Sequence, residues 1–144
     1  MKRTCGECTA CCTVLAVEEL GKAQQERCKH LCGKGCAIYE RRPVACRDFD
    51  CLWLTADMAD KERPDLSGVM LERAQASARG TGLQPIAAYE TRPGGFDGYW
   101  GQKILKRLSR RHLVALIPFG ATEPREVIGP PEQVGAGVEW AKRP

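Results

Sequence analysis

The last two thirds of this sequence contain no cysteine. All nine cysteines lie within the first 51 of its 144 residues. Small domains held together by disulfides usually distribute their bridges along the chain. An odd number of cysteines also cannot pair completely within one chain. Both features argue against a disulfide scaffold.

The chain also lacks a long apolar run. No segment approaches the roughly 18 to 20 apolar residues that a membrane-spanning helix needs. The basic start at residues 1–4 is not followed by the apolar stretch that a secretory signal or a lipid anchor would have. We therefore expect a cytoplasmic protein with no membrane partner. In that reducing compartment, clustered cysteines more often bind metal or carry out redox chemistry than form disulfides.

Signatures of catalysis are scarce. The two histidines, His30 and His112, lack the context of a nucleophilic triad, and we interpret His112 as a helix cap or a surface group. The glycines at positions 94, 95, 98 and 101 match neither the Gly-x-Gly-x-x-Gly fingerprint nor a phosphate loop. We interpret them as flexible loop residues. The sequence identifies no catalytic constellation.

The cysteines that are present have the spacing of a thiolate metal site. A Cys-x-x-Cys turn lets two thiolates reach one metal from the same side. The longer Cys-x-x-Cys-x-x-Cys run also opens iron–sulfur ligand patterns, so zinc and iron both suit the spacing. Neighbouring side chains such as Cys11 and Cys12 point in different directions, which favours two nearby sites or a polynuclear cluster. The run is Cys5-x-x-Cys8-x-x-Cys11-Cys12, followed by Cys28, Cys32, Cys36, Cys46 and Cys51.

These positions resemble a known family. It comprises cysteine-cluster proteins described as chelating zinc or iron and named for a CxxCxxCC signature (the YkgJ type). The resemblance covers about a third of the chain. It rests on the first four cysteines, on Cys28 with Leu31, and on the run Gly35-Cys36-x-Ile38-Tyr39-Glu40-x-Arg42-Pro43-x-x-Cys46-Arg47-x-Phe49-x-Cys51.

The resemblance implies a set of eight metal ligands. Eight thiolates would serve two tetrahedral zinc sites, one four-iron cluster plus one zinc, or two clusters. Cys32 is extra to the family pattern, and His30 is an alternative ligand between two cysteines. The implied ligands are Cys5, Cys8, Cys11, Cys12, Cys28, Cys36, Cys46 and Cys51.

The distribution of apolar residues predicts an α+β protein in which one part depends on metal. Residues 1–54 form a cysteine-rich module, helical or irregular, with few large apolar residues, and segments of this size usually need metal to fold. Residues 55–67 read as a polar connection. We expect residues 68–144 to form a small sheet with one amphipathic helix, packed with the module as one compact unit.

The elements of this second part follow from residue periodicity. Residues 69–75 and 83–91 read as half-buried strands joined by a loop at 77–82. Asp97 is placed as the N-cap of an amphipathic helix over residues 99–111. Residues 113–119 read as a buried strand, with residues 126–128 pairing beside it.

Three functional hypotheses follow. The leading one is a metal-binding protein that chelates zinc or iron, including an iron–sulfur cluster. The second is a redox or electron-transfer centre that serves a partner enzyme. The third is a structural zinc module that binds nucleic acid or an acidic protein through a basic helix face, although a solvated face is the more ordinary role for such charges. That face comprises Lys103, Lys106, Arg107, Arg110 and Arg111.

Charged residues also lie among the cysteines. Arg42 and Arg47 are candidate donors to the cluster or to a carboxylate such as Glu40. Thiolates bound to a divalent ion leave net negative charge, which nearby cations can offset. The charges do not choose between the metals.

Overall fold

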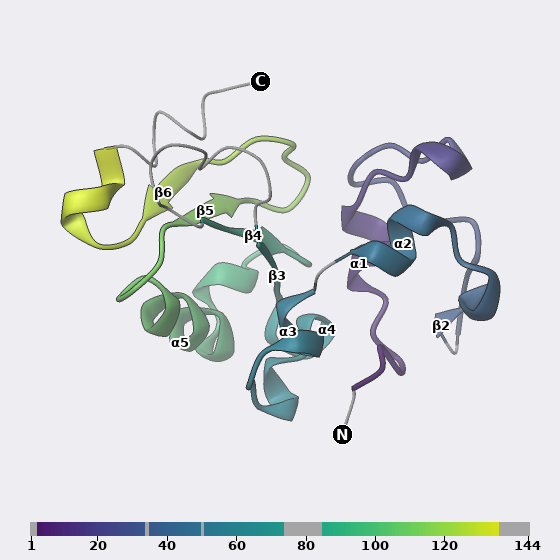
Figure 1. Ribbon diagram of the computed structural model, residues 1–144, viewed down its shortest axis with the longest axis horizontal. Helices are drawn as coiled ribbons and strands as arrows, with labels where there is room; N and C mark the ends of the chain where they lie inside the picture. The colour runs from purple at the N-terminus through teal and green to yellow at the C-terminus, as the bar shows by residue number, and fades with distance from the viewer. Residues whose placement is uncertain (1–2, 34, 50, 74–84, 136–144) are drawn as a thin grey trace.

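The computed structural model describes residues 3–33, 35–49, 51–73 and 85–135. Two parts lie side by side (Figure 1). The cysteine-rich stretch up to residue 49 makes one part, and a four-stranded sheet with its helices makes the other. Helices and strands occur together in the sheet part, so the predicted α+β class is confirmed.

The cysteine-rich part is built from very short elements. The sequence there has no sustained apolar periodicity, and no long helix or strand forms in the described residues. The two strands pair antiparallel with Leu31 opposite Cys36. In chain order the elements are helix α1 (Ala10–Val14), 3-10 helix η1 (Glu18–Leu20), strands β1 (Leu31–Cys32) and β2 (Gly35–Cys36), 3-10 helix η2 (Tyr39–Arg41) and helix α2 (Val44–Asp48).

The other part is a mixed sheet with helices. Its four strands lie in chain order, with β3–β4 and β5–β6 antiparallel and β4–β5 parallel. The parallel pair requires a crossover, and the longest helix, α5, lies in that connection. The strands are β3 (Val69–Arg73), β4 (Ile86–Glu90), β5 (Val114–Ile117) and β6 (Glu126–Ile128). The labelled helices are α3 (Leu52–Thr55), η3 (Asp60–Glu62), α4 (Pro64–Ser67), η4 (Gly95–Asp97) and α5 (Tyr99–Leu108), and residues 131–135 after β6 are helical as well.

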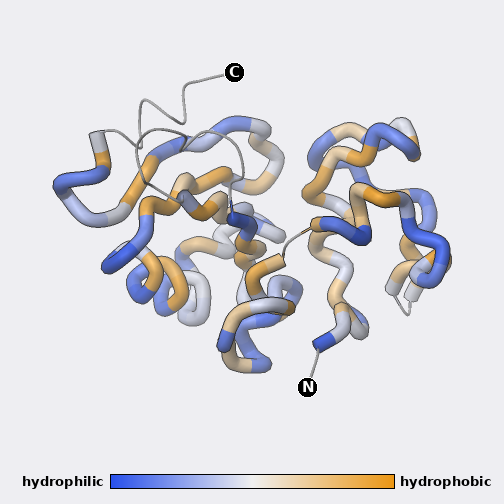
Figure 2. Tube along the Cα trace, in the orientation of Figure 1, coloured by the Kyte–Doolittle hydropathy of each residue, from blue (hydrophilic) through white to orange (hydrophobic). Residues whose placement is uncertain are grey.

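The two faces of the sheet cover different neighbours. Side chains alternate along a strand, so Val69 and Leu71 of β3 share one face, where they pack with α3 and α5 in the main core. The opposite face carries Met70, which is 1% exposed and packs with Ala10 and Val14 of α1. Figure 2 shows the apolar residues concentrated along the central strands. The sheet therefore supplies part of the core of the cysteine-rich part.

Most of the predicted elements of the sheet part are present. The strands at 69–73, 86–90 and 114–117 fall inside the predicted ranges, and β6 pairs antiparallel with β5 as expected. The predicted loop at 77–82 lies outside the described residues. Helix α5 ends at Leu108, and residues 109–111 form a turn. The predicted N-cap is wrong, because Asp97 belongs to η4 and Gly98 takes the N-cap position without a side-chain cap.

The interpretation of the glycines as flexible loop residues is wrong for two of them. Gly95 and Gly101 are buried. A β-carbon added to Gly101 would lie 2.0 Å from the Gly95 carbonyl oxygen, and one added to Gly95 would lie 2.2 Å from the Gly68 oxygen. These three glycines let α5, η4 and the end of α4 approach each other backbone to backbone.

None of the helices in the described ranges has the length and apolar character that crossing a bilayer requires. The longest of them, α5, has 10 residues and carries three lysine or arginine side chains.

Candidate metal centre

The first two cysteines lie in a tight turn. The Cys8 amide donates a hydrogen bond to the Cys5 carbonyl over 2.9 Å, and Gly6 between them has φ +55°. Glycine adopts a positive φ at little cost. Both side chains of the turn line the same cavity.

The next pair begins helix α1 and is tied to the second block. Cys11 and Cys12 follow the N-terminal residue of that helix. The Cys28 amide donates to the Cys12 carbonyl over 2.8 Å, and the Cys28 sulfur accepts a hydrogen bond from the His30 amide over 3.4 Å. A contact between residues 16 positions apart therefore brings the second block of cysteines against α1.

A close backbone approach brings β2 to the first turn. Gly35 has φ +109°, and a β-carbon on it would lie 3.2 Å from the Gly6 carbonyl oxygen. Cys36, the next residue, lines the same cavity as Cys5. Cys46 comes from α2, whose first turn is set by the hydrogen bond from its amide to the Pro43 carbonyl over 3.0 Å.

Seven of the eight predicted ligands line one cavity of about 50 Å³. The sulfur-bearing residues come from the first turn, α1, β2, α2 and the segment before β1. Lys22, Tyr39 and Arg42 line the cavity with them. The seven cysteines are Cys5, Cys8, Cys11, Cys12, Cys28, Cys36 and Cys46.

The eighth predicted ligand, Cys51, lines an adjoining cavity of about 510 Å³. Cys51 is the residue before α3. Its backbone forms an isolated antiparallel β-bridge with Glu72 of β3, so the sheet holds it in place. Four cysteines line both cavities, namely Cys5, Cys8, Cys11 and Cys46. The two cavities therefore share a wall of thiols.

The remaining sulfur and imidazole candidates lie apart from these walls. Cys32 is exposed at the end of β1 and lines neither of the two cavities. The His30 side chain lines neither of them either, although its amide donates to Cys28. The structure thus separates Cys32 from the eight cysteines of the family pattern.

The thiols surround the cavity without converging on one point. None of the nine cysteines forms a disulfide. Within the described ranges, no three His, Cys, Asp or Glu side chains are grouped in a way that could hold a metal ion. In type and number the donors suit zinc or iron, since both bind soft thiolates. Ligation requires these side chains to turn toward a common point.

Two cations face the thiols. Lys22 is 6% exposed, and its ammonium donates to the Thr13, Leu15 and Ala23 carbonyls at the end of α1 and beyond. Arg42 lies over the Tyr39 ring, 3.9 Å from its centroid, and donates its Nε to the Tyr39 carbonyl rather than to Glu40. Both side chains lie where they favour the ionised form of nearby cysteines.

The thiols are not electrostatically equivalent. The hydrogen bond from Cys11 and the charges of Lys22 and Arg42 lower the pKa of Cys12, against the effect of burial. Donation of that hydrogen bond, together with burial, raises the pKa of Cys11. Burial raises the pKa of Cys8 to about 11. Cys12 is therefore the thiol most readily ionised among those with a shifted pKa.

Burial also raises the pKa of two further thiols, Cys5 and Cys46. Arg42 opposes the rise at both positions, and the neighbouring thiols reinforce it. A cation that bound among these sulfurs would reverse the balance, because its charge favours thiolate over thiol.

Comparison of the chain with models of known protein families, with curated proteins and with solved structures finds no match.

Sequence reasoning missed Lys22. The residue stands 10 positions after Cys12 and six before Cys28, in a polar stretch that carries no motif. The position of Lys22 beside the thiols depends on an antiparallel backbone β-bridge between Val17 and Lys22, which folds the segment back toward α1. The one available signal was a lysine between two cysteine blocks, and that signal is weak because most lysines are solvated.

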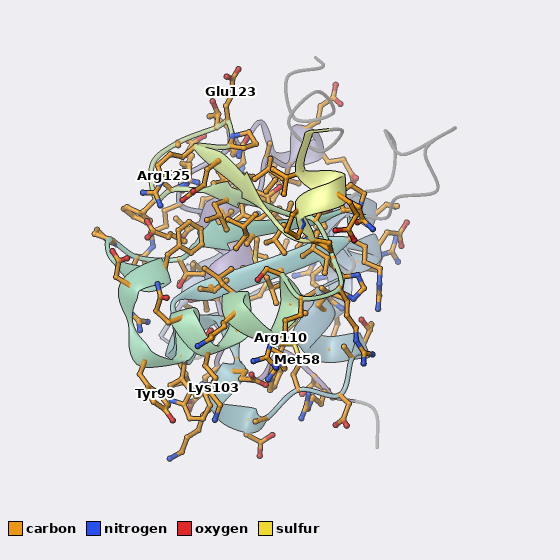
Figure 3. All side chains as sticks on the ribbon, turned by 90° about the vertical axis from the view of Figure 1, so that its left-hand side faces the viewer. Met58, Tyr99, Lys103, Arg110, Glu123 and Arg125 are labelled. Atoms are coloured by element: carbon orange, nitrogen blue, oxygen red, sulfur yellow. The ribbon has the colours of Figure 1, made fainter. Side chains whose placement is uncertain are left out.

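The cations of the basic helix face have different surroundings in the structure. Tyr99 is 72% exposed, and the Lys103 ammonium lies 5.7 Å from its ring centroid and 5.0 Å from that of Trp100. Arg107, however, pairs with the buried Glu62 carboxylate over 2.6 Å. Tyr99 and Lys103 project at the lower edge of the molecule in Figure 3. One of the five predicted cations of this face thus serves the fold.

Proposed function

We propose that this chain is a metal-binding protein that holds zinc or iron, the latter as ions or as an iron–sulfur cluster, through its cysteine thiolates. The observation that carries the proposal is the shared cavity, which collects seven cysteines from two sequence blocks. The resemblance to the CxxCxxCC family supports the same conclusion. The ligands proposed are those seven and Cys51.

The chemistry of the walls suits this role. Thiols must lose their protons to bind a metal, so binding is favoured where cations stabilise the thiolate. Lys22 and Arg42 supply that charge beside Cys12, and Arg42 also faces Cys5. Four thiolates around a divalent ion carry a net charge of about −2, which these two cations offset.

A metal would also supply stability that the local core lacks. The buried core of this part comprises Ala10, Val14 and Met70. Binding of a structural zinc contributes on the order of 10 to 16 kcal/mol in small peptides, compared with about 5 to 15 kcal/mol for the stability of a whole domain. The metal is thus proposed to hold residues 3–49 in their fold.

Anaerobic purification followed by metal analysis and absorption spectroscopy tests the proposal. We expect zinc or iron in stoichiometric amount, with visible charge-transfer bands if an iron–sulfur cluster is present. Cys12→Ser is expected to bind metal at least about tenfold more weakly, since even changes outside the ligand shell cost 10-fold to 100-fold.

The matched control is Cys32→Ser, which removes an exposed thiol that lines neither cavity. This variant is expected to keep the metal content of the wild type. A folded wild-type protein free of both zinc and iron would sink the proposal, as would equal loss of metal in the two variants.

We also propose that the protein functions in the cytoplasm. The support is that no disulfide joins any of its nine cysteines. A reducing compartment keeps such thiols available for metal.

A further inference from the structure

The larger cavity has the size of a small-molecule site. Its volume is about 510 Å³, within the range of about 300 to 1,000 Å³ that is usual for ligand pockets. It lies between the two parts of the molecule. Its walls come from residues 3–11 and 39–49 on one side and from Cys51, α3, Pro64 and Met70 on the other.

Three arginines line this cavity, namely Arg3, Arg42 and Arg47. No aspartate or glutamate is among its described lining residues. The walls therefore present positive charge, which attracts an anion.

These three arginines are not equally committed to the fold. Arg3 lies over the Trp53 ring and donates to the Trp53 and Met58 carbonyls and to Asp60. Arg42 is bonded through Nε alone, to the Tyr39 carbonyl, so its terminal nitrogens keep their donors. The Arg47 amide donates to the Pro43 carbonyl, whereas its guanidinium makes no hydrogen bond or ion pair with another described residue. Arg42 and Arg47 can therefore donate to a bound anion.

The other walls are apolar and partly planar. Phe49, Trp53, Leu54, Pro64 and Met70 line the cavity. Trp53 is 8% exposed and Met70 is 1% exposed, so both are held firmly in place. Ligand sites typically combine such apolar walls with a few charged groups that orient the ligand.

The third wall is the row of thiols shared with the smaller cavity. Cys5, Cys8, Cys11 and Cys46 line both spaces, and Cys51 adds a fifth sulfur to the larger one. A molecule in the larger cavity would therefore lie directly against the proposed metal centre.

We propose that this cavity binds a small molecule that joins an anionic group, phosphate or carboxylate, to an apolar planar part. The anion lies against Arg42 and Arg47, and the apolar part lies against Phe49 and Trp53. The position of this ligand beside a metal centre rests on the proposed function, whereas its binding rests on the cavity itself.

The test is a calorimetric titration of the full chain with phenyl phosphate, benzoate and neutral benzyl alcohol. At least one of the two anions is expected to bind, and benzyl alcohol is expected to bind at least about tenfold more weakly, because it offers no charge to the arginines. Phenyl phosphate against benzoate distinguishes the two anionic groups. Failure of both anions to bind, or equal binding of benzyl alcohol, would overturn the proposal.

Arg47→Gln and Arg41→Gln form the matched pair of variants. Both arginines are exposed, and Arg41 lines neither cavity. Arg47→Gln is expected to weaken binding of the anion about tenfold, and Arg41→Gln is expected to leave it unchanged. Equal effects of the two changes would contradict the assignment.

Metal content is measured on the same samples. A loss of anion binding in Arg47→Gln at wild-type metal content supports the cavity site independently of the metal. Anion binding in a folded protein that holds no metal would sink the proposed function and leave the cavity site standing. Metal-loaded protein that binds neither anion would contradict the cavity site and leave the proposed function standing.

Discussion

At the scale of single residues, the candidate metal centre includes a buried charged side chain as well as its cysteines. Lys22 is almost fully enclosed, yet its ammonium has three backbone carbonyl acceptors and faces several thiols. Burial lowers its pKa, and the neighbouring thiols oppose that shift. A charge in such a place costs free energy unless it is hydrogen-bonded and paired.

Replacement of this lysine tests that reading. Lys22→Met keeps the length of the side chain and removes all three hydrogen bonds, which leaves carbonyls at the end of α1 without their donor. We expect a loss of about 2 kcal/mol in the free energy of unfolding, the typical cost of unsatisfied buried groups. Chemical denaturation monitored by circular dichroism measures it.

Lys29→Met is the control, because Lys29 is exposed. Its effect is expected to stay within about 0.5 kcal/mol, as for most surface changes. If the two variants proved equally stable, Lys22 would have no structural role.

At the scale of elements, the packing of α5 depends on glycine rather than on the helix alone. The helix has the predicted apolar stripe, with Ile104 and Leu105 buried. Gly101 on the same helix lies against the backbone of η4, and η4 lies against Gly68. Periodicity predicts the stripe, but it cannot predict a backbone contact between segments more than 25 residues apart.

The substitution Gly101→Ala sets the helix propensity of α5 against its close backbone contact with η4. By helix propensity alone, alanine would stabilise α5 by about 1 kcal/mol. The new β-carbon would lie 2.0 Å from the Gly95 carbonyl oxygen, so the backbones must separate. We expect net destabilisation of about 1 to 3 kcal/mol, as for overpacked cores, measured as a fall in the denaturation midpoint.

Gly33→Ala provides the comparison, since nothing lies within 4 Å of a β-carbon at that position. Its midpoint is expected to change little. A stabilising effect of Gly101→Ala would show that α5 and η4 can separate at no cost.

At the scale of the whole molecule, the two parts differ in how they are held. Among the described residues, the main hydrophobic cluster of the sheet part contains 12 buried residues, whereas that of the cysteine-rich part contains three, one of which is Met70 from the sheet. Buried apolar area is the main source of folding free energy. Residues 3–49 therefore depend more strongly on any additional stabilisation.

Removal of metal is expected to show this difference. Treatment with a chelator should increase amide hydrogen exchange throughout residues 3–49 while β4 and β5 stay protected. Local opening reflects the local free energy, and under the proposed function seven of the eight metal ligands lie in residues 3–49. Hydrogen exchange followed by mass spectrometry measures both regions in one sample. Equal deprotection of β5 would mean that the molecule unfolds as one unit.

The amount that could be predicted from sequence differs between the two parts. In the sheet part, half-buried patterns, a continuous apolar run at residues 113–119 and helical spacing predicted strands β3 to β6 and helix α5, because these patterns reflect which faces are buried. In the cysteine-rich part, spacing predicted a thiolate metal site and the family resemblance implied eight ligands, but neither gave their distribution between two cavities. That distribution depends on contacts such as Gly35 against Gly6 and the Cys28 amide on the Cys12 carbonyl.

The sequence by itself determined the α+β class, the strands of the sheet and the thiol-rich character of one end, because these are local properties of composition and period. Tertiary structure alone decided that Lys22 faces the thiols, that Met70 completes the core beneath α1, and that Cys51 lines the cavity between the two parts. Each of these depends on where distant segments meet, and no spacing along the chain encodes such a meeting.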